Sequence, residues 1–194
     1  DELKKRGLDK NTLVIFIGDN GAALIRGKGT LYDLGVHVPL IMRWPDEVPA
    51  NKTTDAMVSG EDILPSILEA AGMQPDKDVT GKSFLQVIDP KKYTPHEYIF
   101  AQRGPHSSGL PQNSSYFDLN RTVFDEDYKL IYNINWQVPY DPVDFHKRKM
   151  WQELAQQNKD GRLSEKFSNA FFADPRPMFE LYDRKNDPYE FNNL

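Results

Sequence analysis

Residues 11–21 read Asn-Thr-Leu-Val-Ile-Phe-Ile-Gly-Asp-Asn-Gly. The unbroken apolar run at 13–17 is typical of a strand that is buried on both faces, as in the parallel sheet of an α/β protein. The turn-forming residues 18–21 end this strand sharply. Residues 38–45, Val-Pro-Leu-Ile-Met-Arg-Trp-Pro, predict a second buried strand that a proline turn closes. The first part of the chain is therefore predicted to be α/β.

An amphipathic helix is predicted at residues 61–72. Asp62 lies at its acidic start, and Gly72 supplies the stop signal. Its apolar residues fall on one face at helical spacing. They are Ile63, Leu64, Ile67, Leu68 and Ala71.

The pattern changes after about residue 96 to short strand-like runs separated by polar loops. We expect strands at 97–101, 120–124, 128–133 and 178–183, and a helix at 149–158. The turn at 125–127 is expected to join two of these strands as a hairpin. Two parts follow from this change, an α/β part at residues 1–95 and an antiparallel α+β part at residues 96–194.

The composition excludes several classes of function. The chain has 194 residues, with 24 Lys and Arg against 29 Asp and Glu, and this charge of -5 gives no general basic surface for nucleic acid. No apolar run approaches the roughly 20 residues of a membrane helix. Cysteine is absent, which excludes disulfides, Cys-ligated zinc and thiol catalysis. We therefore expect neither nucleic acid nor a membrane as a partner.

Asp19 and Asn20 are the first candidate site residues. They lie at the carboxyl end of a predicted strand, where ligands bind in open α/β sheets. Their carboxylate and amide oxygens are suitable ligands for Ca²⁺ or Mg²⁺. Taken alone, Asp-Asn-Gly is more often an ordinary turn.

Lys28 lies between Gly27 and Gly29, so a ligand can approach the backbone closely and the ammonium can hold an anion. A phosphate-binding P-loop is rejected, because its glycine spacing and the Ser or Thr after the lysine are both missing. Taken alone, a solvated lysine on a flexible turn is the more common explanation.

The four histidines, His37, His96, His106 and His146, show no metal-binding spacing, and each is more often structural or exposed than functional. His106 lies in the loop 103–109, which follows a predicted strand. This loop combines the cation of Arg103 and an imidazole with small residues, so it is the best candidate to contact a polar substrate.

Taken together, these segments resemble the type I sulfatases in order along essentially the whole chain. Residues 11–21 and 27–41 resemble the second signature region of that family, and residues 62–72 resemble the helix that follows. The closing strands of the family are resembled by four further segments of this chain, residues 128–131, 180–183, 186–190 and 193–194. Within the family, Asn133-Ile134-Asn135-Trp136 and the polar insert before Phe179 are most similar to the heparan N-sulfatase (sulfamidase) branch.

The resemblance implies the C-terminal part of an alkaline-phosphatase-like sulfatase fold, α/β with a small antiparallel α+β subdomain. Its members hydrolyse sulfate esters or sulfamates with a formylglycine nucleophile and a Ca²⁺ ion. Asp19 and Asn20 match the second pair of metal ligands, and Lys28 matches the basic residue that contacts the sulfate. The substrate is expected to be a sulfated saccharide of glycosaminoglycan type, with N-sulfoglucosamine as one candidate.

This sequence departs from the family where the nucleophile is concerned. The motif Cys or Ser followed by x-Pro-x-Arg is absent, as is the early aspartate pair that completes the metal site. We expect the chain to be the C-terminal portion of a sulfatase, inactive alone, with its missing N-terminal part as a partner.

Two alternatives remain open at this point. One is a non-catalytic carbohydrate-binding or assembly module, and the other is a phosphate or phosphonate ester hydrolase of the same superfamily. The resemblance favours a protein that is exported or periplasmic in a bacterium, with a lysosomal or secreted protein as the alternative.

Overall fold

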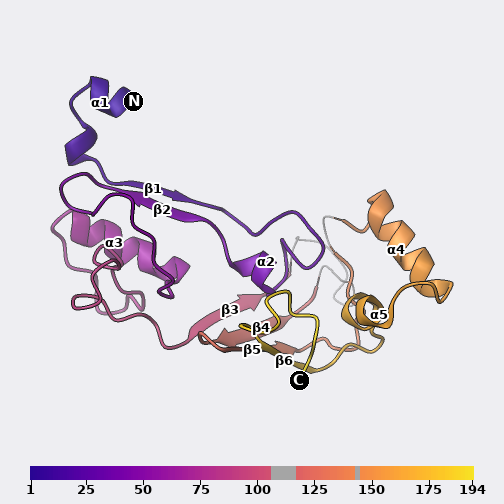
Figure 1. Cartoon of the computed structure of the whole chain (residues 1–194). Coiled ribbons are helices and arrows are strands. Elements are labelled where there is room, and N and C mark those ends of the chain that lie inside the picture. Colours follow the sequence, from indigo (N-terminus) through magenta and orange to yellow (C-terminus); the bar gives the residue numbers. More distant parts are fainter. Residues whose placement is uncertain (106–116, 143–144) are drawn as a thin grey trace. The chain divides into compact units, whose positions relative to one another are not determined.

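The computed structural model describes residues 1–105, 117–142 and 145–194. The chain forms two compact units (Figure 1). One consists of Asp1–Ile17 and Pro39–Ile99, and the other consists of Gly18–Val38 and Phe100–Leu194. The division of the sequence at residues 95 and 96 stays a prediction.

The first unit begins with helix α1 (Glu2–Lys5), the 3₁₀ turn η1 (Asp9–Asn11) and a two-stranded ribbon. Strand β1 (Val14–Ile17) pairs with β2 (Leu40–Arg43) in an antiparallel register. Both strands lie where the apolar runs predict them. Their sequence separation is long because the segment Gly18–Val38 leaves the ribbon and belongs to the other unit.

The environment predicted for these strands is wrong. Their pairing is antiparallel rather than parallel, and the register partners Phe16 and Ile41 are 60% and 61% exposed. Ile15 and Met42, on the opposite face of the ribbon, are half-buried. An apolar run shows that a strand has two apolar faces, but it does not show which elements cover those faces.

Helix α3 (Ile63–Ala70) follows the 3₁₀ turn η2 (Gly60–Asp62) within the predicted range. Its buried residues are Pro65 and Ser66, whereas Leu64 of the predicted apolar face is 53% exposed. The carboxylate of Asp62, just before the helix, is fully buried. Burial of a carboxylate requires hydrogen bonds, and that of Asp62 accepts them from the backbone amides of Ser59 and Lys82.

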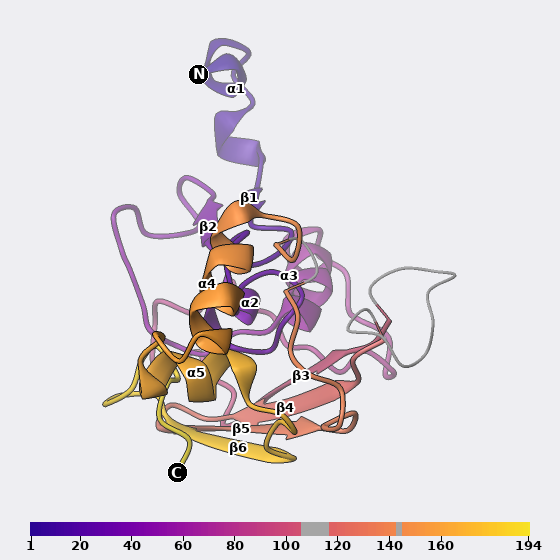
Figure 2. The ribbon, with the colours of Figure 1, turned by 90° about the vertical axis from the view of Figure 1, so that its right-hand side faces the viewer.

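The second unit contains a four-stranded sheet in the order β3-β4-β5-β6 (Figure 2). Its strands are β3 (Ile99–Arg103), β4 (Asn120–Phe124), β5 (Tyr128–Asn133) and β6 (Phe179–Asp183). The pairs β4-β5 and β5-β6 are antiparallel. The four predicted strands and the predicted hairpin are confirmed.

The inner face of this sheet is unusually polar. Its buried side chains alternate along the strands with exposed ones, as the two-residue period requires. They are Asn120, Thr122, Lys129, Ile131, Asn133, Glu180 and Tyr182. Ile131 and Tyr182 form an apolar cluster with Leu31, against which Tyr32 and Val36 pack. The segment Gly18–Val38, which includes helix α2 (Asp33–Val36), therefore covers a face that carries charge.

Helices α4 (Lys149–Lys159) and α5 (Glu165–Phe172) complete the second unit. The sequence predicts α4 but not α5. Trp151 of α4 stacks on Phe172 of α5 with ring centroids 4.8 Å apart. Within the part of the chain that the structure describes, no helix has the length and apolar character needed to cross a membrane.

Candidate active site

Asp19 and Asn20 lie directly after β1, at the start of the segment Gly18–Val38, and both are exposed. The Asn20 side-chain amide donates to the carbonyl of Gly21 at 2.8 Å, which leaves its oxygen outside that bond. Ca²⁺ takes six to eight oxygen ligands. Residues 1–105, 117–142 and 145–194 contain no cluster of three or more His, Asp or Glu side chains suited to a metal. The pair is thus part of a metal site at most.

The loop that carries Lys28 is fixed by its own backbone. The Lys28 amide donates to the carbonyl of Ala22 at 2.8 Å, and the Thr30 hydroxyl lies 2.8 Å from the carbonyls of Arg26 and Gly27. A Cβ atom at Gly27 would collide with the carbonyl of Ala22, so only glycine permits this close approach. The Lys28 side chain is half-buried and has interaction partners. Its position on the loop is therefore well defined.

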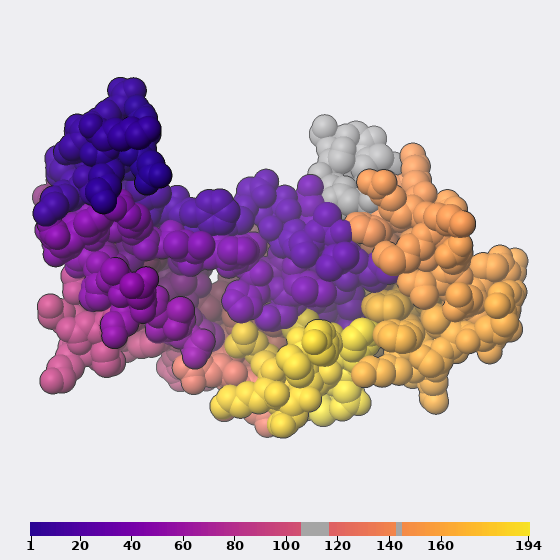
Figure 3. Space-filling view, turned by 45° about the horizontal axis from the view of Figure 1, so that its top comes forward, coloured from indigo at the N-terminus to yellow at the C-terminus, as the bar shows by residue number. Residues whose placement is uncertain are grey.

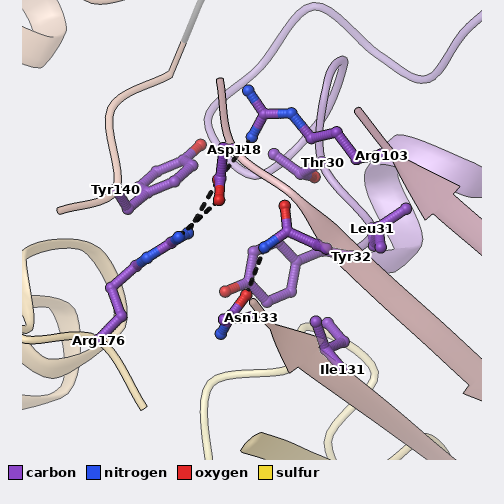
Figure 4. A pocket seen from close by; sticks show the side chains of 10 residues that line it. Thr30, Leu31, Tyr32, Arg103, Asp118, Ile131, Asn133, Tyr140 and Arg176 are labelled. Atoms are coloured by element: carbon purple, nitrogen blue, oxygen red, sulfur yellow. Dashed lines mark hydrogen bonds and ion pairs between the residues drawn. The ribbon is translucent and has the colours of Figure 1, made fainter. Parts of the chain in front are cut away.

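Arg103, at the end of β3, forms an ion pair with a buried aspartate. Its Nη1 donates to Asp118 Oδ2 at 2.8 Å, and the same carboxylate accepts two hydrogen bonds from Arg176, at 3.0 and 2.6 Å. Figure 4 shows both guanidinium groups converging on Asp118. Burial lowers the pKa of Arg103, while the Asp118 charge opposes this effect.

These three residues line a small pocket in the second unit. Its other lining residues are Thr30, Leu31, Tyr32, Asn120, Ile131, Asn133 and Tyr140 (Figure 4). Burial raises the pKa of Tyr140 to about 12, so this hydroxyl is neutral, and it accepts a hydrogen bond from the Arg26 amide at 2.9 Å. Asp19, Asn20 and Lys28 are not among the described residues that line this pocket. The structure thus brings Arg103, but not the predicted metal ligands, to the pocket.

The histidines have separate environments. His106 lies outside the described residues. His96 Nε2 lies 2.8 Å from Oδ2 of Asp62, in the turn that precedes α3. His37 is largely exposed and lies 3.2 Å from Asp33 Oδ2; this contact raises the pKa of His37. His37 and His96 therefore pair with aspartates.

Arg26, two residues before Lys28, is buried. No sequence motif indicates it as a site residue. Its guanidinium carbon lies 3.9 Å from the ring centroid of Tyr32, and its Nη2 lies 3.9 Å from a carboxylate oxygen of Glu180. Burial raises the pKa of Tyr32 well above its ordinary value, so the neutral hydroxyl donates to Glu180 at 2.8 Å. Cation–π contact and ion pairing both hold Arg26 in place.

The family model described as Sulfatase matches residues 1–73. An ulvan-active sulfatase of Formosa agariphila is 32% identical over 195 residues, which cover 100% of this chain and 31% of the relative. This chain belongs to the sulfatase family. Human N-sulphoglucosamine sulphohydrolase is 27% identical over 205 residues, covering 100% of this chain and 39% of the human protein.

A solved structure of a protein in complex with its substrate D-glucosamine-2-N,6-O-disulfate superposes on this sulfatase chain with a TM-score of 0.64. The two are 22% identical, and the match covers 98% of this chain and 31% of the other. The predicted fold class, part of the alkaline-phosphatase-like sulfatase fold, is confirmed. The chain spans about a third of the length of these relatives.

Asp118, Arg176 and Arg26 are the residues of this sulfatase chain that the motifs miss. Asp118 comes just before a predicted strand, and Arg176 lies between two prolines, so neither stands in a pattern that indicates a site. Arg26 has φ +59°, an unusual conformation for a residue with a side chain, and it precedes the glycine pair around Lys28. Only the pairing of distant segments shows that these three charges are buried.

Proposed function

We propose that this chain supplies part of the active site of an enzyme that hydrolyses sulfate esters or sulfamates of sulfated sugars. The observation that carries the proposal is the backbone-locked loop that presents Asp19, Asn20 and Lys28 within the region matched by the sulfatase model. A solvated turn would not need the glycine-only approach between Gly27 and Ala22.

Asp19 and Asn20 fit a calcium ion by the chemistry of their donors. A carboxylate and an amide oxygen are hard ligands, and both residues are exposed at the end of a strand, where further ligands can reach the same ion. The ion supplies positive charge next to the sulfuryl oxygens. Asp19 and Asn20 hold two of its ligand positions, and the rest of the protein supplies the others.

Lys28 is proposed to contact the sulfuryl group of the substrate. As the S–O or S–N bond breaks, its electron pair stays with the departing group, and an ammonium that is already positioned beside the sulfuryl group stabilises the negative charge there. The hydrogen bond from the Lys28 amide to the Ala22 carbonyl fixes the backbone from which this side chain extends. The nucleophile is proposed to be a formylglycine outside these residues, because the chain contains no cysteine and no matching serine motif.

The substrate is proposed to be a sulfated saccharide. Relatives named for ulvan and for N-sulphoglucosamine, and a structure with D-glucosamine-2-N,6-O-disulfate, support this class. N-sulfoglucosamine at a chain end is the specific candidate, and Arg103 and His106 are proposed to contact the sugar. An exported or periplasmic enzyme fits this substrate, since polymeric saccharides do not cross membranes; cell fractionation tests the location.

The decisive experiment is an assay of the complete gene product. Sulfate release is measured from N-sulfoglucosamine, from 6-O-sulfated glucosamine and from ulvan oligosaccharides, with a phosphonate monoester as a fourth substrate. Turnover of a sulfated sugar that Lys28→Ala depresses supports the proposal. Turnover of the phosphonate ester alone, or saccharide binding with no turnover, would instead identify one of the two alternatives.

A further inference from the structure

We propose that Lys129 is a positioning residue whose buried ammonium, bound by Asp33 and Glu190, fixes the segment Gly18–Val38 and thereby orients Asp19, Asn20 and Lys28. The consequence for catalysis rests on the proposed function. The fixing of the segment itself does not, and it can be measured separately.

Lys129 lies on the inner face of β5, and its side chain is fully buried. Its Nζ lies 2.6 Å from Glu190 Oε1 and 3.0 Å from Asp33 Oδ1. Burial of an ammonium is unfavourable unless it is paired and hydrogen-bonded. The two carboxylates come from the covering segment and from the C-terminal residues, so the sheet holds both of these segments through one charge.

Two further charged or titratable side chains contact the cluster that Lys129, Asp33 and Glu190 form. Arg184 Nη2 lies 3.5 Å from Asp33 Oδ1, and His37 Nδ1 lies 3.2 Å from Asp33 Oδ2. The ring centroid of Phe124 lies 5.1 Å from Lys129 Nζ, so an aromatic face also contacts the ammonium. Although burial opposes ionisation, His37, Lys129 and Arg184 hold the pKa of Asp33 well below its usual range. Asp33 is therefore an anion over the working pH range.

Glu190 binds the segment Gly18–Val38 at two points. Its Oε2 accepts a hydrogen bond from the Asp33 amide at 2.7 Å, and its carbonyl accepts one from the Arg26 guanidinium. Glu190 is 2% exposed and has φ +56°, a conformation that a glutamate seldom adopts without surrounding support. The C-terminal residues lie against the segment Gly18–Val38 in the space-filling view (Figure 3).

A short backbone path leads from this cluster to the candidate site residues. The carbonyl of Leu34, next to Asp33, accepts a hydrogen bond from the Ala22 amide at 3.1 Å. Ala22 in turn accepts the hydrogen bond from the Lys28 amide. A Cβ atom at Gly21, adjacent to Asn20, would collide with Leu34 and Gly35. Displacement of Asp33 would therefore move both ends of the loop.

The test compares Lys129→Met, which keeps length and removes charge, with Lys129→Arg, which keeps charge, in the complete gene product. Glu190→Gln is the milder second variant. Lys185→Met is the matched control, because Lys185 is exposed and pairs with Asp127 at the surface. Amide hydrogen exchange is measured at Ala22, Lys28 and Asp33, whose amides are all hydrogen-bonded, and at the β4-β5 ladder.

We expect exchange at the amides of Ala22, Lys28 and Asp33 to rise about tenfold or more in Lys129→Met and Glu190→Gln, while the β4-β5 ladder stays protected. Lys129→Arg should restore much of the protection, and Lys185→Met should change nothing. With a sulfated sugar as substrate, Lys129→Met should lower kcat about 10- to 100-fold, the scale of a small misplacement of site residues.

Two results would overturn the inference. Loop exchange that equals that of the wild type in Glu190→Gln would show that the cluster does not hold the segment. If amide exchange rises equally at the loop and at the β4-β5 ladder in both Lys129→Met and Glu190→Gln, Lys129 contributes only to global stability. If the wild type releases no sulfate but the loop still loosens selectively, the positioning role stands and the proposed function fails.

Discussion

The Arg176 guanidinium binds both oxygens of the buried Asp118 carboxylate, with Nη1 3.0 Å from Oδ2 and Nη2 2.6 Å from Oδ1. Such two-point pairing fixes the orientation as well as the distance of the two groups. Arg103 adds a third bond to the same carboxylate. One buried anion thus joins the end of β3 to the segment that precedes β6.

Asp118→Asn should therefore be strongly destabilising. The substitution leaves two buried guanidinium groups without their shared anion, and loss of one partner of a buried ion pair costs about 3–5 kcal/mol. Urea denaturation of the complete gene product measures the change. Asp127→Asn is the control, because it removes only an exposed pair with Lys185, whose loss should have little effect on stability. Equal changes in the two variants would contradict the structural role of Asp118.

Lys28→Ala should lower kcat about 10²- to 10³-fold and raise KM much less, because the ammonium acts on charge that develops in the transition state. Lys28→Arg should be milder, since it keeps the charge and shifts the geometry. Steady-state kinetics with a sulfated sugar gives both constants. Lys159→Ala, at the exposed end of α4, serves as the control. An unchanged kcat in Lys28→Ala would show that Lys28 is a solvated turn residue with no role in catalysis.

Asp19→Asn should weaken calcium binding by about tenfold or more, because Ca²⁺ prefers carboxylate oxygens and the substitution removes one negative charge from the site. Calorimetric titration of the metal-free complete protein measures the affinity. Activity lost in this variant should return in part at high calcium concentration. Asp46→Asn is the control, since Asp46 pairs with Lys10 on the surface. A calcium affinity that is equal in both variants would exclude Asp19 as a ligand.

The titration of His37 should depend on Asp33. The hydrogen bond to Asp33 raises the pKa of His37 above its ordinary value of 6.5. The stabilisation from this raised pKa is fully present below pH 6.5 and is lost as pH rises through the folded-state pKa. In Asp33→Asn, the NMR titration midpoint of His37 should fall to its ordinary value or below, because burial, Arg184 and Lys129 all lower the pKa and the Asp33 charge no longer opposes them. A midpoint that does not move would show that the contact is absent in solution.

His106→Ala is predicted to lower kcat/KM for the sulfated sugar about tenfold, the scale of one lost polar contact. Activity on a small aryl sulfate, which lacks the sugar hydroxyls, should change far less. Both substrates are assayed with the same variant. Equal losses on the two substrates would make His106 catalytic or structural, and no loss on either would remove the loop 103–109 from the site.

The local elements of this chain follow from its sequence because their signals are local. The hairpin around residues 125–127 has polar turn residues between two alternating strands, and both β4 and β5 form where predicted. The order of the sulfatase motifs likewise identifies the family and points to Asp19, Asn20 and Lys28 as candidates. Helix α5 is not predicted, because polar residues interrupt its apolar ones in the sequence. Its Phe171 packs against Phe191, which is distant in the sequence.

Only the tertiary structure determines which charges are buried. Lys129 stands in a run that predicts an ordinary alternating strand, yet its fully buried ammonium is paired with Asp33 and Glu190. In the same way, Phe16 lies in an apolar run but is exposed. A side chain's burial and pairing depend on segments far away in the chain, and the free-energy cost of burying a charge is smaller when such a segment supplies a partner of opposite charge. The sequence alone determined the strands and the family, whereas the folded chain determined which residues hold the loop with Asp19 and Lys28.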